Sequence, residues 1–134
     1  AAGQGDIAIV NSYYIGLLLA SEKEEEINAG NAVSVFFPNQ GDGERGAHIN
    51  VSGIALAKNA PNKENAIELI KYLTSVEGQE TYVNNSYEYS VNPNVKPDEI
   101  VQAWGEFKKD PVDLNMLGVK RDEAIRIFDK TGWK

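Results

Sequence analysis

Ile7-Ala8-Ile9-Val10-Asn11-Ser12-Tyr13-Tyr14 is the stretch on which the prediction of the fold depends. Its first four residues are apolar without alternation, a pattern typical of a strand buried on both faces of a parallel sheet. Ligands of such sheets bind beyond the carboxyl ends of the strands, where the tyrosine pair follows. Deprotonated phenols are hard oxygen donors and suit a hard, highly charged cation. Asn11 and Ser12 add neutral hydrogen-bonding groups that could hold an accompanying anion.

Paired tyrosines also have an ordinary structural role. An aromatic side chain at a strand end often covers the edge of a core and leaves its hydroxyl in water. The pair by itself therefore leaves both interpretations open, and the rest of the chain has to decide between them.

The composition indicates one globular domain of ordinary character. The chain has 134 residues, of which 42% are hydrophobic and 25% are charged, and it is long enough to bury a core. Its net charge of -7, with 13 basic residues that form no cluster, argues against nucleic-acid binding. No stretch approaches the roughly 20 apolar residues of a membrane span. The lack of cysteine excludes zinc-finger, thiolate-nucleophile and iron–sulfur sites.

The first residues contain neither an initiator methionine nor a recognisable signal peptide, and Met116 is the sole methionine of the sequence. The first predicted strand begins almost at once, near residue 6. We therefore expect the start to be a processed or an excised end, and the short lead-in favours excision.

Alternating helices and strands predict an α/β fold, with helices packed on a mainly parallel sheet. A helix is expected over residues 15–27, with the acidic run at residues 22–26 on its solvated surface. Further strands are expected at residues 33–37 and 54–58. Other helices are expected over residues 61–73, 75–84, 97–109 and 120–130. Thr74-Ser75-Val76-Glu77 has the form of a capping box and marks the start of the second of these.

Two further tyrosines lie on an extended piece of the sequence. Tyr87 and Tyr89 are two residues apart and so point the same way, which makes them candidates to line a ligand site. Tyr82 falls on a predicted helix and is expected to pack against the protein. His48, the one histidine, stands near a strand start, where a structural hydrogen bond is a more frequent role than metal ligation.

Several motifs occur in an order that resembles one known family. They are Val10-Asn11-Ser12-Tyr13-Tyr14, residues 48–55, the helix that includes Ser75-Val76-Glu77-Gly78-Gln79, then Glu88-Tyr89-Ser90-Val91, and the closing Ala124-Ile125-Arg126-Ile127-Phe128. Over nearly its whole length the chain is similar to the C-terminal part of bacterial ferric-iron-binding proteins, the periplasmic receptors of iron ABC transporters. The Ser-x-Glu-Gly-Gln helix is shared by many receptors of that superfamily, whereas the tyrosine pair points to iron.

The resemblance implies a fragment of the two-lobe periplasmic-binding-protein fold of type 2. In that fold, crossing strands join two α/β lobes that close on the ligand. Residues 1–49 and 93–134 would then belong to one lobe, and residues 50–92 to the hinge crossing and the other lobe. Ser90 stands where the family often has proline, a departure that affects the hinge more than the site.

By resemblance, Tyr13 and Tyr14 are ligands of Fe(III), and Asn11 helps to hold a synergistic anion such as phosphate or carbonate, with Ser12 as a second candidate. A bound cation displaces the phenol protons, so binding should release protons and weaken in acid. The implied protein is not an enzyme. It would capture Fe(III) in the periplasm or at the extracytoplasmic surface and deliver it to an inner-membrane ABC permease, with its remaining ligands supplied by the N-terminal part of the family's fold.

Other interpretations remain open at this point. A receptor of the same superfamily could carry a polyamine, thiamine or a sugar, whose sites favour aromatic walls and carboxylates. A truncated chain could lack tight binding of its own, and unpaired strand edges could produce a non-native dimer. Catalysis is disfavoured because no nucleophile–base pair accompanies the single histidine.

Overall fold

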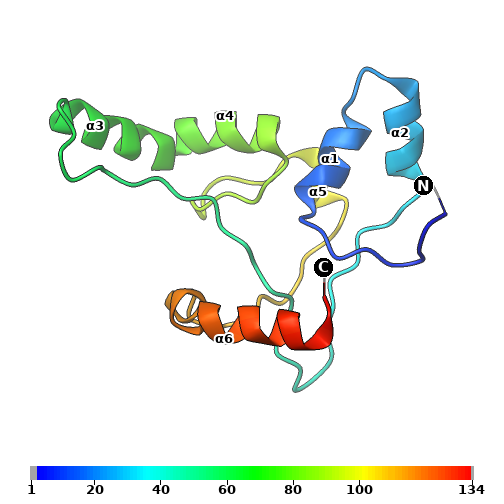
Figure 1. The fold of residues 1–134 in the computed structure, drawn as a ribbon. Coiled ribbons are helices and arrows are strands. Elements are labelled where there is room, and N and C mark those ends of the chain that lie inside the picture. Colours follow the sequence, from blue (N-terminus) through cyan, green and yellow to red (C-terminus); the bar gives the residue numbers. More distant parts are fainter. Residues whose placement is uncertain (1–2, 134) are drawn as a thin grey trace. The chain divides into compact units, whose positions relative to one another are not determined.

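The computed structural model of the protein describes residues 3–133, which form two compact units. One unit comprises residues 3–36 and 50–106, and the other comprises residues 37–49 and 107–133. The helices of the first unit are α1 (Tyr13–Leu19), α2 (Glu24–Asn31), α3 (Lys63–Thr74), α4 (Val76–Ser86) and α5 (Glu99–Gln102) (Figure 1). The second unit contains α6 (Asn115–Thr131).

The predicted strands are not paired into a sheet within the described residues. They are residues 7–10, 33–37 and 54–58. The one pairing of this kind in residues 3–133 is an isolated parallel bridge between Ala47 and Lys109. In the first predicted strand, Ile7 and Ile9 are 92% and 90% exposed. A strand exists only through hydrogen bonds to a neighbouring backbone, which an apolar run does not itself supply, so the expected sheet is not formed within this part of the chain.

The helix predicted over residues 15–27 is two helices, α1 and α2, and this expectation is corrected. Ser21 lies between them, and its hydroxyl accepts a hydrogen bond from the backbone N–H of Lys23 at 3.1 Å and donates one to Glu26 at 2.6 Å. A serine that bonds the following backbone in this way ends one helix and starts the next. The glutamates at positions 24–26 form the first turn of α2, where negative charge interacts favourably with the helix dipole.

The corner between α3 and α4 confirms the predicted helix start but changes the capping residue. Ser75 caps α4, because its hydroxyl accepts the N–H of Gly78 at 3.1 Å. Thr74 bonds backward instead, to carbonyl groups of α3. Gly78 lies so close to the carbonyl oxygen of Tyr72 that an added Cβ would collide with it, which explains a glycine within this motif.

Gln79 joins this corner to the segment that follows α4. Its buried side chain donates a hydrogen bond to the carbonyl of Leu73 at 2.7 Å. Its oxygen accepts from the hydroxyl of Ser90 and from the N–H of Val91, both at 2.9 Å. These three hydrogen bonds offset the free energy that burying the amide of Gln79 would otherwise cost. They also link the end of α3 to Ser90 and Val91, so they fix the direction in which the chain leaves α4.

In the first unit, α1 contacts both α4 and α5. Val83 of α4 and Val101 of α5 are 1% and 0% exposed. The helix predicted over residues 97–109 is wrong in length, because α5 ends after one turn at Gln102 and Gly105 has a φ of 82°, outside the helical region. The helix that carries the tyrosine pair therefore packs against both of the helices that hold these buried valines.

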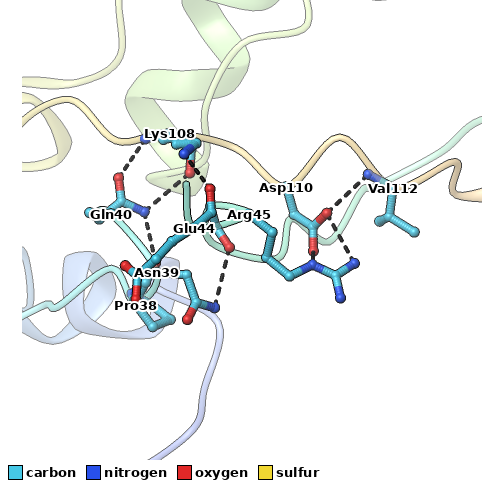
Figure 2. A network of polar contacts seen from close by, with 9 residues as sticks. Pro38, Asn39, Gln40, Glu44, Arg45, Lys108, Asp110 and Val112 are labelled. Atoms are coloured by element: carbon cyan, nitrogen blue, oxygen red, sulfur yellow. Dashed lines mark hydrogen bonds and ion pairs between the residues drawn. The ribbon is translucent and has the colours of Figure 1, made fainter. Parts of the chain in front are cut away.

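Polar contacts hold the second unit together (Figure 2). Arg45 Nε lies 2.7 Å from Asp110 Oδ2, and the N–H of Lys108 donates to Gln40 Oε1 at 2.6 Å. The backbone N–H of Ala47 donates to the carbonyl of Lys108, and that of Asp110 donates to the carbonyl of Ala47, each at 2.8 Å. Residues 38–47 and 108–112, far apart in the sequence, are therefore tied by both backbone and side-chain bonds.

The last helix is longer than predicted. α6 begins at Asn115, ahead of the expected start at residue 120, and the carboxylate of Asp113 accepts the N–H of Asn115 at 2.9 Å. Gly132 ends it as predicted, with a φ of 68° in the left-handed region. Residues of α6 are exposed throughout, including its apolar ones.

Candidate functional site

The tyrosine pair opens α1. Tyr13 and Tyr14 are the first two residues of this helix, directly after Ser12 at the N-cap. Their ring centroids are 4.3 Å apart and the ring planes are tilted by 37°. Tyr13 is half-buried and Tyr14 is 51% exposed. The two candidate ligands therefore lie together at one end of a short helix.

Two asparagine side chains meet beside the pair. The carbonyl of Asn11 accepts the N–H of Tyr14 at 3.3 Å, and the side-chain oxygen of Asn11 accepts from Nδ2 of Asn50 at 3.4 Å. The side-chain oxygen of Asn50 is itself bonded to the N–H of Val51 at 3.0 Å. That second bond orients the amide of Asn50 so that its NH₂ group faces Asn11.

A polar pocket of about 390 Å³ lies beside Tyr13, within the first unit. Its lining includes Asn11, Tyr13, Asn50, Ser52, Tyr82 and Glu88. Hydroxyl and amide groups thus surround a single carboxylate. Of the predicted metal and anion ligands, Asn11 and Tyr13 line the pocket, whereas Tyr14 and Ser12 do not. The hydroxyl of Ser12 forms no capping bond to α1.

Glu88 is the functional candidate that sequence reasoning missed. Its carboxylate accepts hydrogen bonds from the hydroxyl of Ser52, at 3.0 and 3.4 Å to its two oxygens, and from the hydroxyl of Tyr82 at 2.5 Å. The sequence contains no local signal for this role, because Ser52 lies 36 residues before Glu88 and meets it only in the folded chain.

Tyr87 and Tyr89 lie next to the pocket in sequence but not in its lining. Tyr87 ends α4 in the left-handed conformation, with a φ of 56°, and packs so closely on Gly16 of α1 that an added Cβ there would collide with it. Tyr89 is half-buried, and burial raises its pKa. His48 is exposed and belongs to the second unit.

The surroundings of Tyr13 hold its proton in the absence of a cation. Hydrogen bonding with Tyr14 is the main cause that raises the pKa of Tyr13, followed by burial and the charge of Tyr14. Glu88 raises this pKa further through its charge, and a hydrogen bond from Asn11 opposes the effect. The pKa of Tyr82 is raised chiefly because its hydroxyl donates to the carboxylate of Glu88. A free Tyr13 is therefore protonated at neutral pH, and a bound cation is needed to displace the proton.

Carboxylates and imidazoles do not gather into a metal site in residues 3–133, where no three His, Cys, Asp or Glu side chains are arranged to hold an ion. The phenol oxygens of Tyr13 and Tyr14 are the candidate donors in this part of the chain. None of the described helices combines the length and apolar character that a membrane span requires.

The fold is that of a known class, the bacterial extracellular solute-binding proteins. The sequence profile of that family matches residues 2–109, and the chain belongs to the family. The chain is 42% identical over all 134 residues to iron uptake protein A2 of Synechocystis, of which it covers 39%. It is 26% identical over 132 residues to the major ferric iron-binding protein of Neisseria meningitidis, of which it covers 38%.

Two solved structures give the same result. A Trichodesmium protein called IdiA or FutA, in complex with iron and citrate, superposes with a TM-score of 0.90 and 40% identity over 97% of this chain and 40% of that one. The ferric binding protein from Campylobacter jejuni superposes with a TM-score of 0.86 and 33% identity over 94% of this chain and 39% of that one. These similarities confirm the predicted fold class, a fragment of a type 2 periplasmic-binding-protein fold, and the resemblance to ferric-iron-binding proteins. The chain spans about two fifths of the length of these relatives.

Proposed function

We propose that this chain belongs to a receptor that binds Fe(III) through the phenolates of Tyr13 and Tyr14. The observation that carries the proposal is the placement of the two rings, 4.3 Å apart, beside a polar pocket that Tyr13 lines. Fe(III) is a hard Lewis acid, and phenolate is a hard, charged ligand that matches it. The names of the relatives, iron uptake protein and ferric iron-binding protein, support iron as the cargo.

An anion such as phosphate or carbonate completes the proposed site. The side-chain oxygen of Asn11 is occupied by Asn50, so Asn11 presents its NH₂ group as a donor. This group lowers the pKa of Tyr13, and it is available as a donor to an oxyanion beside the metal. Ser12 remains the second candidate for this anion. The Trichodesmium relative, in complex with iron and citrate, supports an oxyanion as the companion of the metal.

The proposal places the protein outside the inner membrane, as a non-enzymatic receptor that passes Fe(III) to an ABC permease. The description of the family as extracellular and the transport names of the relatives support this placement. We also propose that residues 1–49 and 93–134 belong to one lobe of the receptor, and residues 50–92 to the crossing and the other lobe.

The experiment that tests the cargo is a titration with Fe(III) in the presence of phosphate or carbonate, followed by visible absorption. We expect a saturable phenolate-to-iron charge-transfer band. Tyr13→Phe and Tyr14→Phe each remove one phenolate, and each should abolish most of the band and weaken binding about tenfold or more, which corresponds to about 1.4 kcal/mol or more.

Tyr72→Phe is the matched control for this experiment. Tyr72 lies on α3, is exposed and does not line the pocket, so this variant should keep both the band and the affinity. The proposal fails if the protein gives no band, or if Tyr13→Phe and Tyr14→Phe both retain the full band of the unmodified protein.

A further inference from the structure

We infer that Glu88 is a positioning residue of the proposed iron site. Its carboxylate fixes the segment that carries Asn50, and Asn50 in turn orients Asn11 toward the anion. The inference rests on the proposed function and deepens it, because it assigns control of anion binding to a residue that is not itself a ligand.

The first step is the bridge that Glu88 makes. The hydroxyl of Ser52 donates to its carboxylate from one side and the hydroxyl of Tyr82, on α4, donates from the other. Both donors are neutral, and no lysine or arginine of residues 3–133 forms an ion pair with Glu88. Hydrogen bonds to an ionised acceptor are stronger than those between neutral groups, so this carboxylate is a firm anchor for Ser52.

The second step is that the segment anchored by Glu88, residues 50–53, has few other contacts that hold it in place. Residues 50–53 are exposed and belong to no helix, and within the described chain their backbone groups form no hydrogen bond to other backbone groups. Without backbone hydrogen bonds or burial, residues 50–53 have few interactions that offset the conformational entropy lost when they are ordered. The bond between Ser52 and Glu88 is therefore its principal tether to the helical part of the first unit.

The third step leads from the tether to the anion. Asn50 lies two residues before Ser52, and its amide is oriented by its own bond to the N–H of Val51. With Ser52 held, the NH₂ group of Asn50 reaches the oxygen of Asn11 at 3.4 Å. That contact decides which end of the Asn11 amide faces the pocket. Without the tether, the amide of Asn11 can turn its oxygen toward the anion and repel it.

The inference is tested by the phosphate concentration that gives half of the maximal Fe(III) band at fixed iron. Glu88→Ala should raise this concentration on the order of fivefold to tenfold. At saturating phosphate the band should return to full amplitude, because Tyr13 and Tyr14 are intact. Glu88→Gln keeps one of the two acceptor oxygens and loses the charge, so its half-maximal phosphate concentration should lie between those of the unmodified protein and Glu88→Ala.

Two further variants separate positioning from a general loss of structure. Ser52→Ala should reproduce the effect of Glu88→Ala, and the double variant should add nothing, because the two residues share one link. Glu80→Ala removes an exposed glutamate of α4, the helix that carries Tyr82, and should change nothing. If Glu88→Ala fails to fold by circular dichroism, Ser52→Ala and Glu88→Gln carry the test.

The failures of the two proposals can be told apart. A protein without a band in the presence of phosphate contradicts the iron proposal itself. A normal band whose phosphate dependence is the same in Glu88→Ala, Ser52→Ala and Glu80→Ala overturns the role of Glu88 and leaves the iron proposal standing. A loss of band in Glu88→Ala that saturating phosphate does not restore also overturns it, because a positioning residue does not remove the ligands.

Discussion

The phenol protons of Tyr13 and Tyr14 govern how the proposed site responds to pH. Hydrogen bonding with Tyr14, burial and nearby charge raise the pKa of Tyr13, so this phenol is protonated when no metal is bound. Fe(III) must displace that proton, because the ligand is a phenolate, and each phenolate ligand formed releases one proton. Protons compete with iron, so we expect affinity to fall as the pH is lowered, with about two protons released per ion bound.

Proton release can be measured with an indicator dye in weakly buffered solution, with Fe(III) supplied from a chelate whose own proton balance is known. Tyr13→Phe should release about one proton fewer per bound iron than the unmodified protein. Equal release by both proteins would mean that Tyr13 does not give up its proton to the metal.

The hydrogen bond between Tyr82 and Glu88 predicts that the free energy of unfolding falls at high pH. The folded-state pKa of Tyr82 is raised because its hydroxyl donates to the carboxylate. This stabilisation is fully present below the unfolded pKa of about 10 and is lost as the pH rises through the folded value. Urea unfolding at pH 8 and near pH 11 should show a fall in the free energy of unfolding that is smaller in Tyr82→Phe. An equal fall in both proteins would show that this phenol does not contribute.

Residues that lie together in the sequence were the ones that could be predicted as a site. Asn11, Tyr13 and Tyr14 fall within four positions, so one local pattern contains all of them. Asn50 and Glu88 join them only through the folding of the chain, by way of hydrogen bonds that no local pattern encodes. Asn11, Tyr13 and Tyr14 could be predicted as candidates because they are neighbours in the sequence. Asn50 and Glu88 could not, because they are far from these residues in the sequence.

At the scale of elements, the position of α1 depends on a glycine. Gly16 is the one buried residue of α1, and an added Cβ would collide with Tyr87. Tyr87 cannot easily withdraw, since it ends α4 in a left-handed conformation. We expect Gly16→Ala to cost about 1–3 kcal/mol of unfolding free energy, as for overpacked cores, and to weaken Fe(III) binding by displacing the helix that carries the tyrosines.

Gly118→Ala is a matched control for that substitution. Gly118 is also helical, in α6, but nothing lies within 4 Å of its added Cβ. Alanine should therefore stabilise that helix by about 0.5–1 kcal/mol. Chemical denaturation measures both variants. If Gly16→Ala is as stable as Gly118→Ala, the contact between α1 and Tyr87 is not the constraint that the distances indicate.

Helix existence was easier to predict than helix length. The apolar spacing within α3 predicts this helix well, because 3.6-residue periodicity extends over its whole length. The break between α1 and α2 arises from the side-chain bonds of Ser21, and the early end of α5 precedes the left-handed Gly105. Single polar groups and single backbone angles decide these boundaries, and periodicity is insensitive to both.

At the scale of the whole molecule, the predicted sheet shows what an apolar pattern can encode. The pattern of residues 7–10 indicates burial, yet Ile7 and Ile9 are almost fully exposed in the described chain. Burial requires a particular neighbouring backbone, and the pattern contains no information about which one. The fold class was nevertheless predicted correctly from the order of motifs along the sequence, as the superpositions on two ferric-binding relatives confirm.

The division into two units leads to a last prediction. The carboxylate of Asp110 is 9% exposed and pairs with Arg45, so Arg45→Ala leaves it without its cation. The loss should be about 1–2 kcal/mol, between the values for exposed and for buried ion pairs. Within the unit of residues 37–49 and 107–133, the backbone bonds of Ala47 and Asp110 lie closest to this pair in sequence.

Hydrogen exchange measures this effect residue by residue. In Arg45→Ala, the amides of Ala47 and Asp110 should exchange about tenfold faster, while the amide of Val83 in the first unit keeps its protection. Arg121→Ala is the control, because Arg121 and its nearest acid, 4.0 Å away, are both exposed. An equal acceleration at Val83 would contradict separate units, since it would mean that both parts of the chain open in one cooperative step.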